Sequence, residues 1–337
     1  MTQKPLSAFL APRSNIDFVY GEERAREIET RTTLIEPYPV VEPDDWRTTI
    51  GAGSEIEVLF STWGMPAINE KDLGEFFPRL KAVFYAAGSV QLFARPLLQR
   101  DVTLVSAWRA NAVSVAQFTV AQTMLALKGY FRNIRQYDGS PSTYESAFRG
   151  AGAYREAVGL LGAGAIGSLV IENLIAQDVT VLVWDPFLDP CAAKRMGAIQ
   201  VESIEELFQR SYVVSNHLAN NDQTAGLITG ELMRQMRRDA TFINTGRGRT
   251  VNEAEMIETL RERPDLLALL DVTFPEPMGA DSRLRSLPNV IVSSHIAGTI
   301  GNEVHRMADL CIGEFDRFAS GQPLEHQVTI DLLRTMA

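Results

Sequence analysis

The sequence contains few of the residues that build disulfide frameworks or metal centres. It has two cysteines, Cys191 and Cys311, and four histidines in 337 residues. Two cysteines so far apart exclude a disulfide framework, and no H-E-x-x-H or paired C-x-x-C spacing indicates a metal site. We therefore expect no metal, and a reducing compartment such as the cytoplasm.

The sequence also lacks a long apolar run and an excess of basic residues. No stretch of about 18 apolar residues occurs, so no membrane-spanning segment is predicted, and the N-terminus does not have the pattern of a signal peptide. A formal net charge of -10 argues against nucleic acids and anionic membranes as partners, because both require basic patches. With 45 % hydrophobic and 22 % charged residues, the composition is typical of a soluble globular protein of about two domains.

What the sequence does contain is a regular alternation of apolar runs with charged helical patterns. Charged stretches at 21–29 and 68–80 predict helices. Strands that alternate with helices form a parallel sheet covered by helices, so the first part of the chain is expected to be a small α/β domain. Its apolar runs predict strands at 6–12, 32–37, 57–63, 81–88 and 102–108.

A second alternating run follows a predicted helix over 113–132 and a connection over 136–155 that is rich in Gly, Ser and Tyr. A complete dinucleotide-binding sheet requires six strands. The second run predicts six, at 157–162, 179–185, 211–217, 240–246, 266–272 and 289–295.

An amphipathic helix over 301–322 and a short tail end the sequence. The tail contains no second sheet, so we expect it to return to the first domain. This predicts a substrate domain made of residues 1–112 and 305–337, with a cofactor domain of residues 113–304 inserted into it.

The second run begins with the stretch VGLLGAGAIG, which we call the glycine turn. Its glycines, Gly162, Gly164 and Gly167, have the spacing G-x-G-x-x-G between an apolar run and a helical pattern. In a dinucleotide-binding turn, the first glycine makes the turn, the second lets a pyrophosphate approach, and the third lets helix and strand pack closely. The N–H groups at the helix start, including those of Ala165 and Ile166, would hold the phosphates. The alternative is a glycine-rich bend in a buried strand.

Asp185 ends the next predicted strand, about 20 residues beyond the turn, where the dinucleotide fingerprint has an acidic residue. Its carboxylate can accept hydrogen bonds from ribose hydroxyls and would repel a 2'-phosphate. No Lys or Arg follows in the stretch PFLDP, so the sequence favours NAD over NADP. The alternative for Asp185 alone is a solvated loop residue.

Three later strand ends carry polar residues that an inert sheet does not need. Arg247 lies in INTGRGRTVNE, Glu276 in LLDVTFPEPM and His295 in VIVSSHIAG. Each follows an apolar strand at the carboxyl edge, where doubly wound sheets bind ligands. Singly, they have ordinary interpretations as a surface salt-bridge partner, a loop carboxylate and a core histidine. Together, at one edge of a cofactor domain, they indicate a catalytic site.

With its motifs in this order, the chain resembles the D-isomer-specific 2-hydroxyacid dehydrogenase family. The motifs are the glycine turn with Asp185, NTGRG, LDV with PEP, and NVIVSSHIAG. The resemblance implies two doubly wound α/β domains, in which a Rossmann cofactor domain is inserted into a flavodoxin-like substrate domain. It also implies an active site between the domains and a homodimer formed mainly through the cofactor domains.

The chemistry implied by the resemblance is hydride transfer between NAD(H) and C2 of a 2-oxo or 2-hydroxy acid. His295 would be the acid/base, a role that suits histidine because its ordinary pKa is about 6.5. Glu276 would orient the ring and favour its protonated form. Arg247 would bind the substrate carboxylate and polarise the carbonyl oxygen.

Further site residues follow from the same resemblance. Asp271 would lie near the nicotinamide carboxamide, and His217 and Thr245 would line the cofactor. Backbone N–H groups of Gly88 and Ser89, in the stretch YAAGSV, would hold the substrate carboxylate.

The substrate side chain is not predicted. Trp63 and Tyr85 either shape its pocket or pack in the core. The resemblance implies an enzyme acting on a small 2-oxo or 2-hydroxy acid of the D series. The alternative is an NAD-sensing binding protein of the corepressor type without physiological turnover, since such proteins can keep the same three polar residues.

Overall fold

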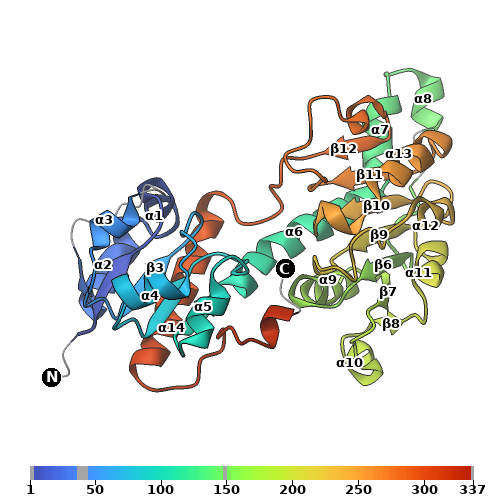
Figure 1. Cartoon of the computed structure of the whole chain (residues 1–337). Helices are drawn as coiled ribbons and strands as arrows, with labels where there is room; N and C mark the ends of the chain where they lie inside the picture. The colour runs from blue at the N-terminus through green and yellow to red at the C-terminus, as the bar shows by residue number, and fades with distance from the viewer. Residues whose placement is uncertain (1–3, 36–44, 147–149, 335–337) are drawn as a thin grey trace. The chain divides into compact units, whose positions relative to one another are not determined.

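The chain folds into two units, and the first of them is built from both ends of the sequence (Figure 1). In this computed structural model, residues 4–35, 45–146 and 150–334 are described. Unit 1 comprises Met1–Asn111 with Thr299–Ala337, and unit 2 comprises Ala112–Gly298. The insertion of one α/β unit into another, expected from the sequence, is confirmed.

The second crossing between the units follows Gly298, whereas the sequence placed it after residue 304. The physical reason lies in two contacts of the intervening segment. The N–H of Thr299 donates to Asn111 Oδ1 at 3.0 Å. Val304 is fully buried among the core residues of unit 1.

Unit 1 contains a five-stranded sheet in which every pair of strands is parallel. The strand order β2-β1-β3-β4-β5 is that of flavodoxin-like folds. The expected strand over 32–37 lies partly outside the described residues. The strands are β1 (Leu6–Phe9), β2 (Thr33–Leu34), β3 (Val58–Ser61), β4 (Ala82–Tyr85) and β5 (Thr103–Ser106).

Helices cover both faces of this sheet because successive strand residues point to opposite sides. Phe60 and Phe84 pack with one group of helices, and Leu59 and Val83 pack with the other. The first group is α1 (Arg13–Val19), α2 (Gly21–Arg31) and α14 (His305–Ala319). The second is α3 (Trp46–Ile50), α4 (Glu70–Phe76) and α5 (Ala94–Gln99).

Unit 2 contains a seven-stranded parallel sheet in the order β12-β11-β10-β9-β6-β7-β8. Counted from the β8 edge, the first six strands of this sheet follow the Rossmann order. All six strands expected from the sequence are present, and the short β8 is an addition. The strands are β6 (Ala157–Leu161), β7 (Thr180–Trp184), β8 (Ile199–Gln200), β9 (Val213–Asn216), β10 (Thr241–Asn244), β11 (Leu267–Leu270) and β12 (Val290–Val292).

Helices fill the crossovers of unit 2, and two apolar cores lie on the two faces of its sheet. One helix expected over 113–132 is instead two, α6 (Trp108–Leu127) and α7 (Tyr130–Gln136). The break falls at Gly129, whose φ of 70° is left-handed. Glycine adopts this conformation more readily than other residues and often ends a helix in it. The others are α8 (Pro141–Ser146), α9 (Ala165–Ile175), α10 (Pro190–Arg195), α11 (Ile204–Arg210), α12 (Gly230–Arg234) and α13 (Glu253–Glu262).

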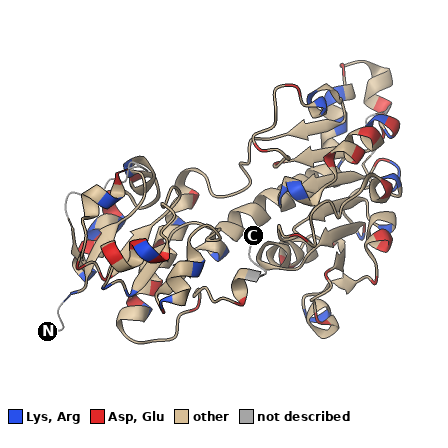
Figure 2. Ribbon diagram, in the orientation of Figure 1, with Lys and Arg blue, Asp and Glu red and all other residues tan. Residues whose placement is uncertain are grey.

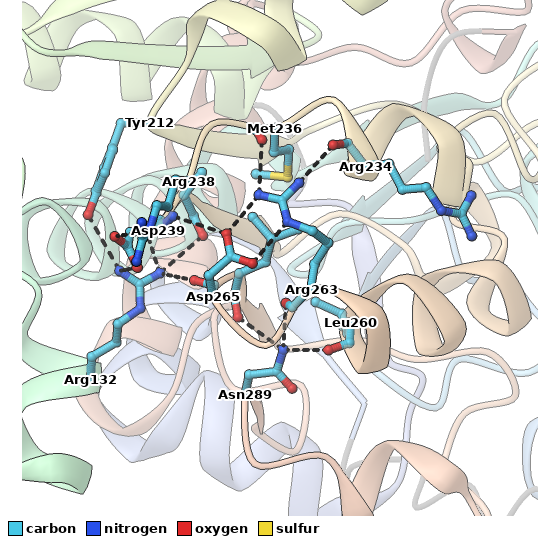
Figure 3. A network of polar contacts seen from close by, with 12 residues as sticks. Arg132, Tyr212, Arg234, Met236, Arg238, Asp239, Leu260, Arg263, Asp265 and Asn289 are labelled. Atoms are coloured by element: carbon cyan, nitrogen blue, oxygen red, sulfur yellow. Dashed lines mark hydrogen bonds and ion pairs between the residues drawn. The ribbon is translucent and has the colours of Figure 1, made fainter.

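A polar network fastens the amino ends of β10, β11 and β12 (Figure 3). The Arg132 guanidinium donates to the carbonyls of Asp239 and Asp265 at 2.6 and 2.7 Å. Arg263 pairs with the Asp265 carboxylate at 2.7 Å, and Asn289 donates to the Leu260 carbonyl at 2.8 Å. These side chains satisfy backbone groups that precede the strands. Their role is therefore structural, at the edge of the sheet opposite the predicted site.

Acidic and basic residues are interspersed along the helices of each unit (Figure 2). None of the helices in the described part of the chain is long and apolar enough to cross a membrane.

Candidate active site

The glycine turn joins β6 to α9 and leaves an open cradle at the helix start. A Cβ on Gly167 would lie 2.1 Å from the Gly162 carbonyl oxygen, so only glycine lets the helix pack this closely on the turn. A Cβ on Gly164 would meet nothing within 4 Å, and no side chain caps α9. Uncapped N–H groups beside open space fit the pyrophosphate of a dinucleotide.

Asp185 follows β7 and ties it to the glycine turn. Its carboxylate accepts the N–H of Ala163 and the N–H of Phe187, each at 2.8 Å. Each carboxylate oxygen can accept a further hydrogen bond. The half-buried carboxylate is thus fixed beside the turn while keeping acceptor capacity for a ribose.

His217 follows β9, and its backbone packs beneath the glycine turn. The His217 carbonyl oxygen would lie 3.0 Å from a Cβ on Gly162. Its Nε2 is 3.0 Å from Ser215 Oγ, and its Nδ1 is buried without a partner among the described residues. Burial lowers the pKa of His217 to about 4, so the ring is neutral. An unpartnered ring nitrogen at the turn also fits a site that is completed by a cofactor.

Thr245 follows β10 and contacts α6. Its hydroxyl lies 3.0 Å from that of Thr119, and both are buried. This contact fixes the start of the NTGRG segment.

The structure brings Glu276 and His295 into contact. They lie in the loops that follow β11 and β12, two neighbouring strands. Glu276 Oε1 is 2.5 Å from His295 Nδ1. The two side chains are 37 % and 46 % exposed, so the pair is open to a ligand. A carboxylate on one ring nitrogen fixes the ring and directs the other nitrogen away.

Asp271, at the end of β11, holds the loop that carries His295. The Ser293 hydroxyl and the Ile296 N–H donate to its Oδ1 at 2.6 and 2.9 Å, and the Ala297 N–H donates to its Oδ2 at 2.8 Å. The His295 N–H donates to the Asp271 carbonyl at 2.9 Å. His295 has a φ of 59°, a conformation that costs a non-glycine residue energy and persists only under such restraint.

Arg247 lies in the loop after β10, and Gly248 places that loop against the segment leading to Glu276. A Cβ on Gly248 would lie 2.1 Å from the carbonyl of Thr273, so the two backbones touch. Burial lowers the pKa of Arg247, and the nearby Glu276 carboxylate opposes that shift. The geometry thus brings together Arg247, Glu276 and His295.

Three buried residues that the sequence analysis missed hold the backbone of Arg247. Asn216 donates from Nδ2 to Asn244 Oδ1 at 3.0 Å and to Thr250 Oγ1 at 2.8 Å. The Thr250 hydroxyl donates to the Arg247 carbonyl at 2.7 Å. The sequence signal that could have identified two of them is an asparagine at the end of each of two apolar strands. A polar side chain is costly to bury there unless it is hydrogen-bonded.

Gly88 and Ser89 belong to unit 1, in the loop after β4. Tyr85, at the end of β4, is buried against Phe93, with ring centroids 5.0 Å apart. Burial raises the pKa of Tyr85 to about 12, which agrees with a packing role. Trp63 is half-buried and packs against both cores of unit 1.

One group in the described residues has the composition of a metal site, namely Glu314, Glu325 and His326. Glu314 Oε2 accepts the N–H groups of Glu325 and His326, each at 3.0 Å. Glu314 also faces Arg317. These contacts explain the buried carboxylate as an anchor for the segment after α14.

Comparisons with known proteins agree with this geometry. The family model for the D-isomer specific 2-hydroxyacid dehydrogenase NAD binding domain matches residues 121–297. D-3-phosphoglycerate dehydrogenase from Mycobacterium leprae (strain TN) is 30 % identical over 259 residues, which are 75 % of this chain and 48 % of the relative. The enzyme of the same name from Methanocaldococcus jannaschii is 28 % identical over 248 residues, 72 % of this chain and 46 % of the relative. The chain thus spans about half the length of the curated relatives it matches.

Solved structures share the fold over nearly the whole chain. The apo form of D-mandelate dehydrogenase from Rhodotorula graminis has a TM-score of 0.78 and 21 % identity, covering 97 % of this chain and 98 % of that one. A phosphoglycerate oxidoreductase from Rhizobium etli has a TM-score of 0.75 and 20 % identity, covering 97 % and 99 %. Because the family model matches more than half of the 337 residues, the chain belongs to the D-isomer specific 2-hydroxyacid dehydrogenase family and contains its NAD binding domain.

Proposed function

We propose that this chain is an NAD(H)-dependent D-2-hydroxyacid dehydrogenase that reduces a small 2-oxo acid. The observation that carries the proposal is the contact of 2.5 Å between His295 Nδ1 and Glu276 Oε1. It lies beside the half-buried Arg247, at the carboxyl edge of the sheet in the NAD binding domain. An acid/base and a cation at this edge are the two groups that carbonyl reduction needs from the protein.

His295 is the proton donor in reduction and the proton acceptor in oxidation. Because Glu276 occupies Nδ1, Nε2 is the nitrogen that faces the substrate oxygen. Glu276 accepts the Nδ1 proton and so fixes the orientation of the ring during proton transfer. When bound, NADH would supply the hydride for C2.

Arg247 binds the substrate carboxylate and polarises the carbonyl oxygen. It stays charged although burial lowers its pKa, because the ordinary arginine pKa lies above 12. Its planar fork can hold two oxygens at once. Burial strengthens this interaction because water screens it less.

The cofactor is held along the same edge. The glycine turn and the first N–H groups of α9 hold the pyrophosphate, and Asp185 accepts the ribose hydroxyls. His217 and Thr245 line the cofactor, and Asp271 lies toward the nicotinamide end. The support is the open cradle at Gly164 and the unpartnered Nδ1 of His217.

The substrate is a small or medium 2-oxo acid, with glyoxylate, hydroxypyruvate, pyruvate and phenylpyruvate as the compounds to test. In unit 1, the backbone N–H groups of Gly88 and Ser89 hold its carboxylate. Curated relatives named D-3-phosphoglycerate dehydrogenase add phosphorylated hydroxy acids to the panel.

The test measures loss of NADH absorbance with these acids for the wild-type chain and for His295→Ala. Loss of the general acid is expected to lower kcat about a thousandfold. His305→Gln is the matched control, since the His305 ring hydrogen-bonds to the Val19 carbonyl in unit 1 and its loss should leave the rate unchanged. NADPH is run beside NADH and should be the poorer reductant.

Turnover that survives in His295→Ala would overturn the assignment of the acid. Tight NADH binding with no turnover on any acid would favour the NAD-sensing binding protein instead.

We further propose that two copies of the chain associate through α7 and α8. Tyr130 and Ile134 are four residues apart and share one face of α7, and Tyr137 directly follows the helix. Tyr144 of α8 lies 6.5 Å from Tyr137 by ring centroids. The four side chains are 45–58 % exposed. An exposed apolar cluster of this kind marks an interface.

Both cysteines are free, which supports a cytoplasmic location.

A further inference from the structure

One peptide unit in the segment that leads to Glu276 is held by two contacts. This unit joins Thr273 to Phe274. A Cβ on Gly248 would lie 2.1 Å from the Thr273 carbonyl oxygen and 2.7 Å from the Phe274 nitrogen, so the Gly248 backbone packs directly on the peptide. The Phe274 N–H donates to Glu253 Oε2 at 3.2 Å. The unit is therefore fixed by packing and by a hydrogen bond at its N–H.

Both contacts come from the stretch that begins with Arg247 and ends with Glu253, the first residue of α13. Within this stretch, the Val251 N–H donates to the Gly248 carbonyl at 3.0 Å, which closes a tight turn. A parallel bridge joins Val251 to Ile228. The stretch is thus fixed internally and anchored to a neighbouring segment, so Arg247 and Glu253 keep one spatial relation.

The held peptide determines where the Glu276 carboxylate lies, because little of the chain between them can rotate. The Thr273 hydroxyl donates to the Pro275 carbonyl at 2.9 Å, which closes the segment around Phe274. The ring of Pro275 fixes its own φ. Glu276 follows directly, and its Oε1 is 2.5 Å from His295 Nδ1. A shift of the held peptide would therefore move the carboxylate that orients the histidine.

Glu253 is a partly buried carboxylate, and no cation among the residues that the structure describes shifts its pKa. Burial raises the pKa of Glu253, and the hydrogen bond from the Phe274 N–H opposes that shift. A carboxylate is costly to bury unless hydrogen bonds or charges compensate it. The Phe274 N–H and the positive end of the α13 dipole supply that compensation. The contact thus stabilises both the carboxylate and the peptide.

We propose that Glu253 is a positioning residue that holds Glu276, and through it His295, in register with Arg247. This deepens the proposed function, on which it rests. Proton donation by the histidine and binding of the oxo acid by the arginine act on one substrate, so the two groups must keep a fixed separation. Without an acceptor on residue 253, the peptide is held only by its packing on Gly248. A displacement of about 1 Å in a catalytic group costs about a hundredfold in rate.

The experiment compares kcat, KM and the Kd for NADH in the wild type, Glu253→Ala and Glu253→Gln, with the best acid of the panel. Glu253→Ala removes the acceptor, so kcat should fall about thirtyfold. KM and the Kd for NADH should change less than about threefold. Glu253→Gln keeps a carbonyl oxygen for the Phe274 N–H and removes only the charge. It should recover kcat to within about threefold of the wild type.

Glu255→Ala is the matched control. Glu255 lies in the same first turn of α13, and its Oε2 accepts the N–H of Gly230 at 2.9 Å. It therefore makes the same kind of contact with a different segment. Glu255→Ala should lower the melting temperature at least as much as Glu253→Ala does and leave kcat unchanged.

A second measurement does not require turnover. The ring C–H proton resonances of His295, assigned by their absence from the spectrum of His295→Ala, report the contact of the ring with Glu276. These resonances should shift in Glu253→Ala and keep their wild-type positions in Glu253→Gln and Glu255→Ala.

Unchanged His295 resonances in Glu253→Ala would overturn the positioning role, and so would an unchanged kcat of this variant in an active protein. A loss of kcat in Glu255→Ala as large as that in Glu253→Ala would also overturn it, because the effect would then reflect only the stability of α13. Failure of the proposed reductase has a different appearance. A wild type that reduces no acid, with His295 resonances that move only in Glu253→Ala, would support the positioning role and contradict the enzyme.

Discussion

At the scale of the residue, the candidate site depends on side chains that hold backbone groups as much as on those that do chemistry. Asp271 is the clearest case. Its two oxygens accept hydrogen bonds from Ser293, Ile296 and Ala297, which surround His295. The left-handed φ of His295 is maintained by these contacts. Asp271 is thus a positioning residue for the histidine as well as a proposed neighbour of the cofactor.

Asp271→Asn is predicted to destabilise this loop and to lower kcat. In the wild type, the Asp271 carboxylate oxygens accept backbone N–H groups. The NH2 group of the asparagine would face one of these N–H groups instead of an oxygen. That buried donor would then have no acceptor. We expect a loss of about 2 kcal/mol in the free energy of unfolding by urea. We expect kcat to fall about tenfold or more, because the histidine is misplaced.

Ser293→Ala is the matched control for this prediction, because it removes one neutral hydrogen bond from the same carboxylate. Its cost should be about 1 kcal/mol. Equal stability of the asparagine variant and the wild type would contradict the positioning role.

At the scale of the element, glycines decide how closely two loops approach and how much space is left at the start of α9. Gly248 lets the loop after β10 touch the Thr273 carbonyl, which brings Arg247 beside Glu276. Gly164 opens the start of α9, where no protein atom lies within 4 Å of a Cβ. One glycine therefore serves packing and the other leaves room for a ligand.

Gly248→Ala and Gly164→Ala are predicted to have opposite signatures. The first creates an overlap with backbone that cannot move aside cheaply, so it should cost about 2 kcal/mol or more of stability. The second meets no protein atom, so the melting temperature without cofactor should be unchanged. Its methyl group would occupy the cradle, so the Kd for NADH should rise about tenfold. A Gly164→Ala variant that binds NADH normally would place the pyrophosphate elsewhere.

At the scale of the whole molecule, each unit has its own sheet, its own cores and its own fixed ion pairs. In unit 1, Asp72 is buried and lies 2.8 Å from Arg47. In unit 2, Asp265 pairs with Arg263 (Figure 3). The pKa of each carboxyl is lowered, first by the hydrogen bond from its arginine, against the opposing effect of burial.

Acidification is predicted to destabilise the protein through these pairs. A carboxyl whose pKa is lower in the folded than in the unfolded chain adds stability above its unfolded pKa of about 4 and loses it as pH falls through the folded value. Asp72→Asn should therefore lower the free energy of unfolding at pH 7 by about 1–2 kcal/mol and flatten its decline below pH 4. Asp17→Asn, at an exposed ion pair, serves as the control. Parallel pH curves for wild type and Asp72→Asn would contradict this account.

The proposed association of two copies is also tested at this scale. Ile134→Glu should shift the mass measured by light scattering from that of a dimer to that of a monomer, because a charge would be buried in the interface. Leu92→Glu, at an exposed leucine of unit 1, should leave the mass unchanged. A wild-type protein that is monomeric in this measurement would contradict the proposed association of two copies.

The sequence by itself determined the class of the fold and most of the polar residues to examine. Apolar runs of strand length alternating with helical patterns permit only helices packed on parallel sheets, because the period and length of each run are local properties. The glycine spacing and the polar residues after strands β10, β11 and β12 could be found for the same reason. The break at Gly129 and the short β8 were missed, because a single glycine and a two-residue strand carry little local signal.

Only the tertiary structure decided which of these residues touch. The contact of Glu276 with His295 depends on β11 and β12 being neighbours in the sheet, and the position of Arg247 depends on Gly248 lying against Thr273. Asn216 and Asn244, which support the Arg247 loop, are joined by a hydrogen bond between residues distant in the sequence. Such pairings are set by strand order and packing, which no local pattern encodes.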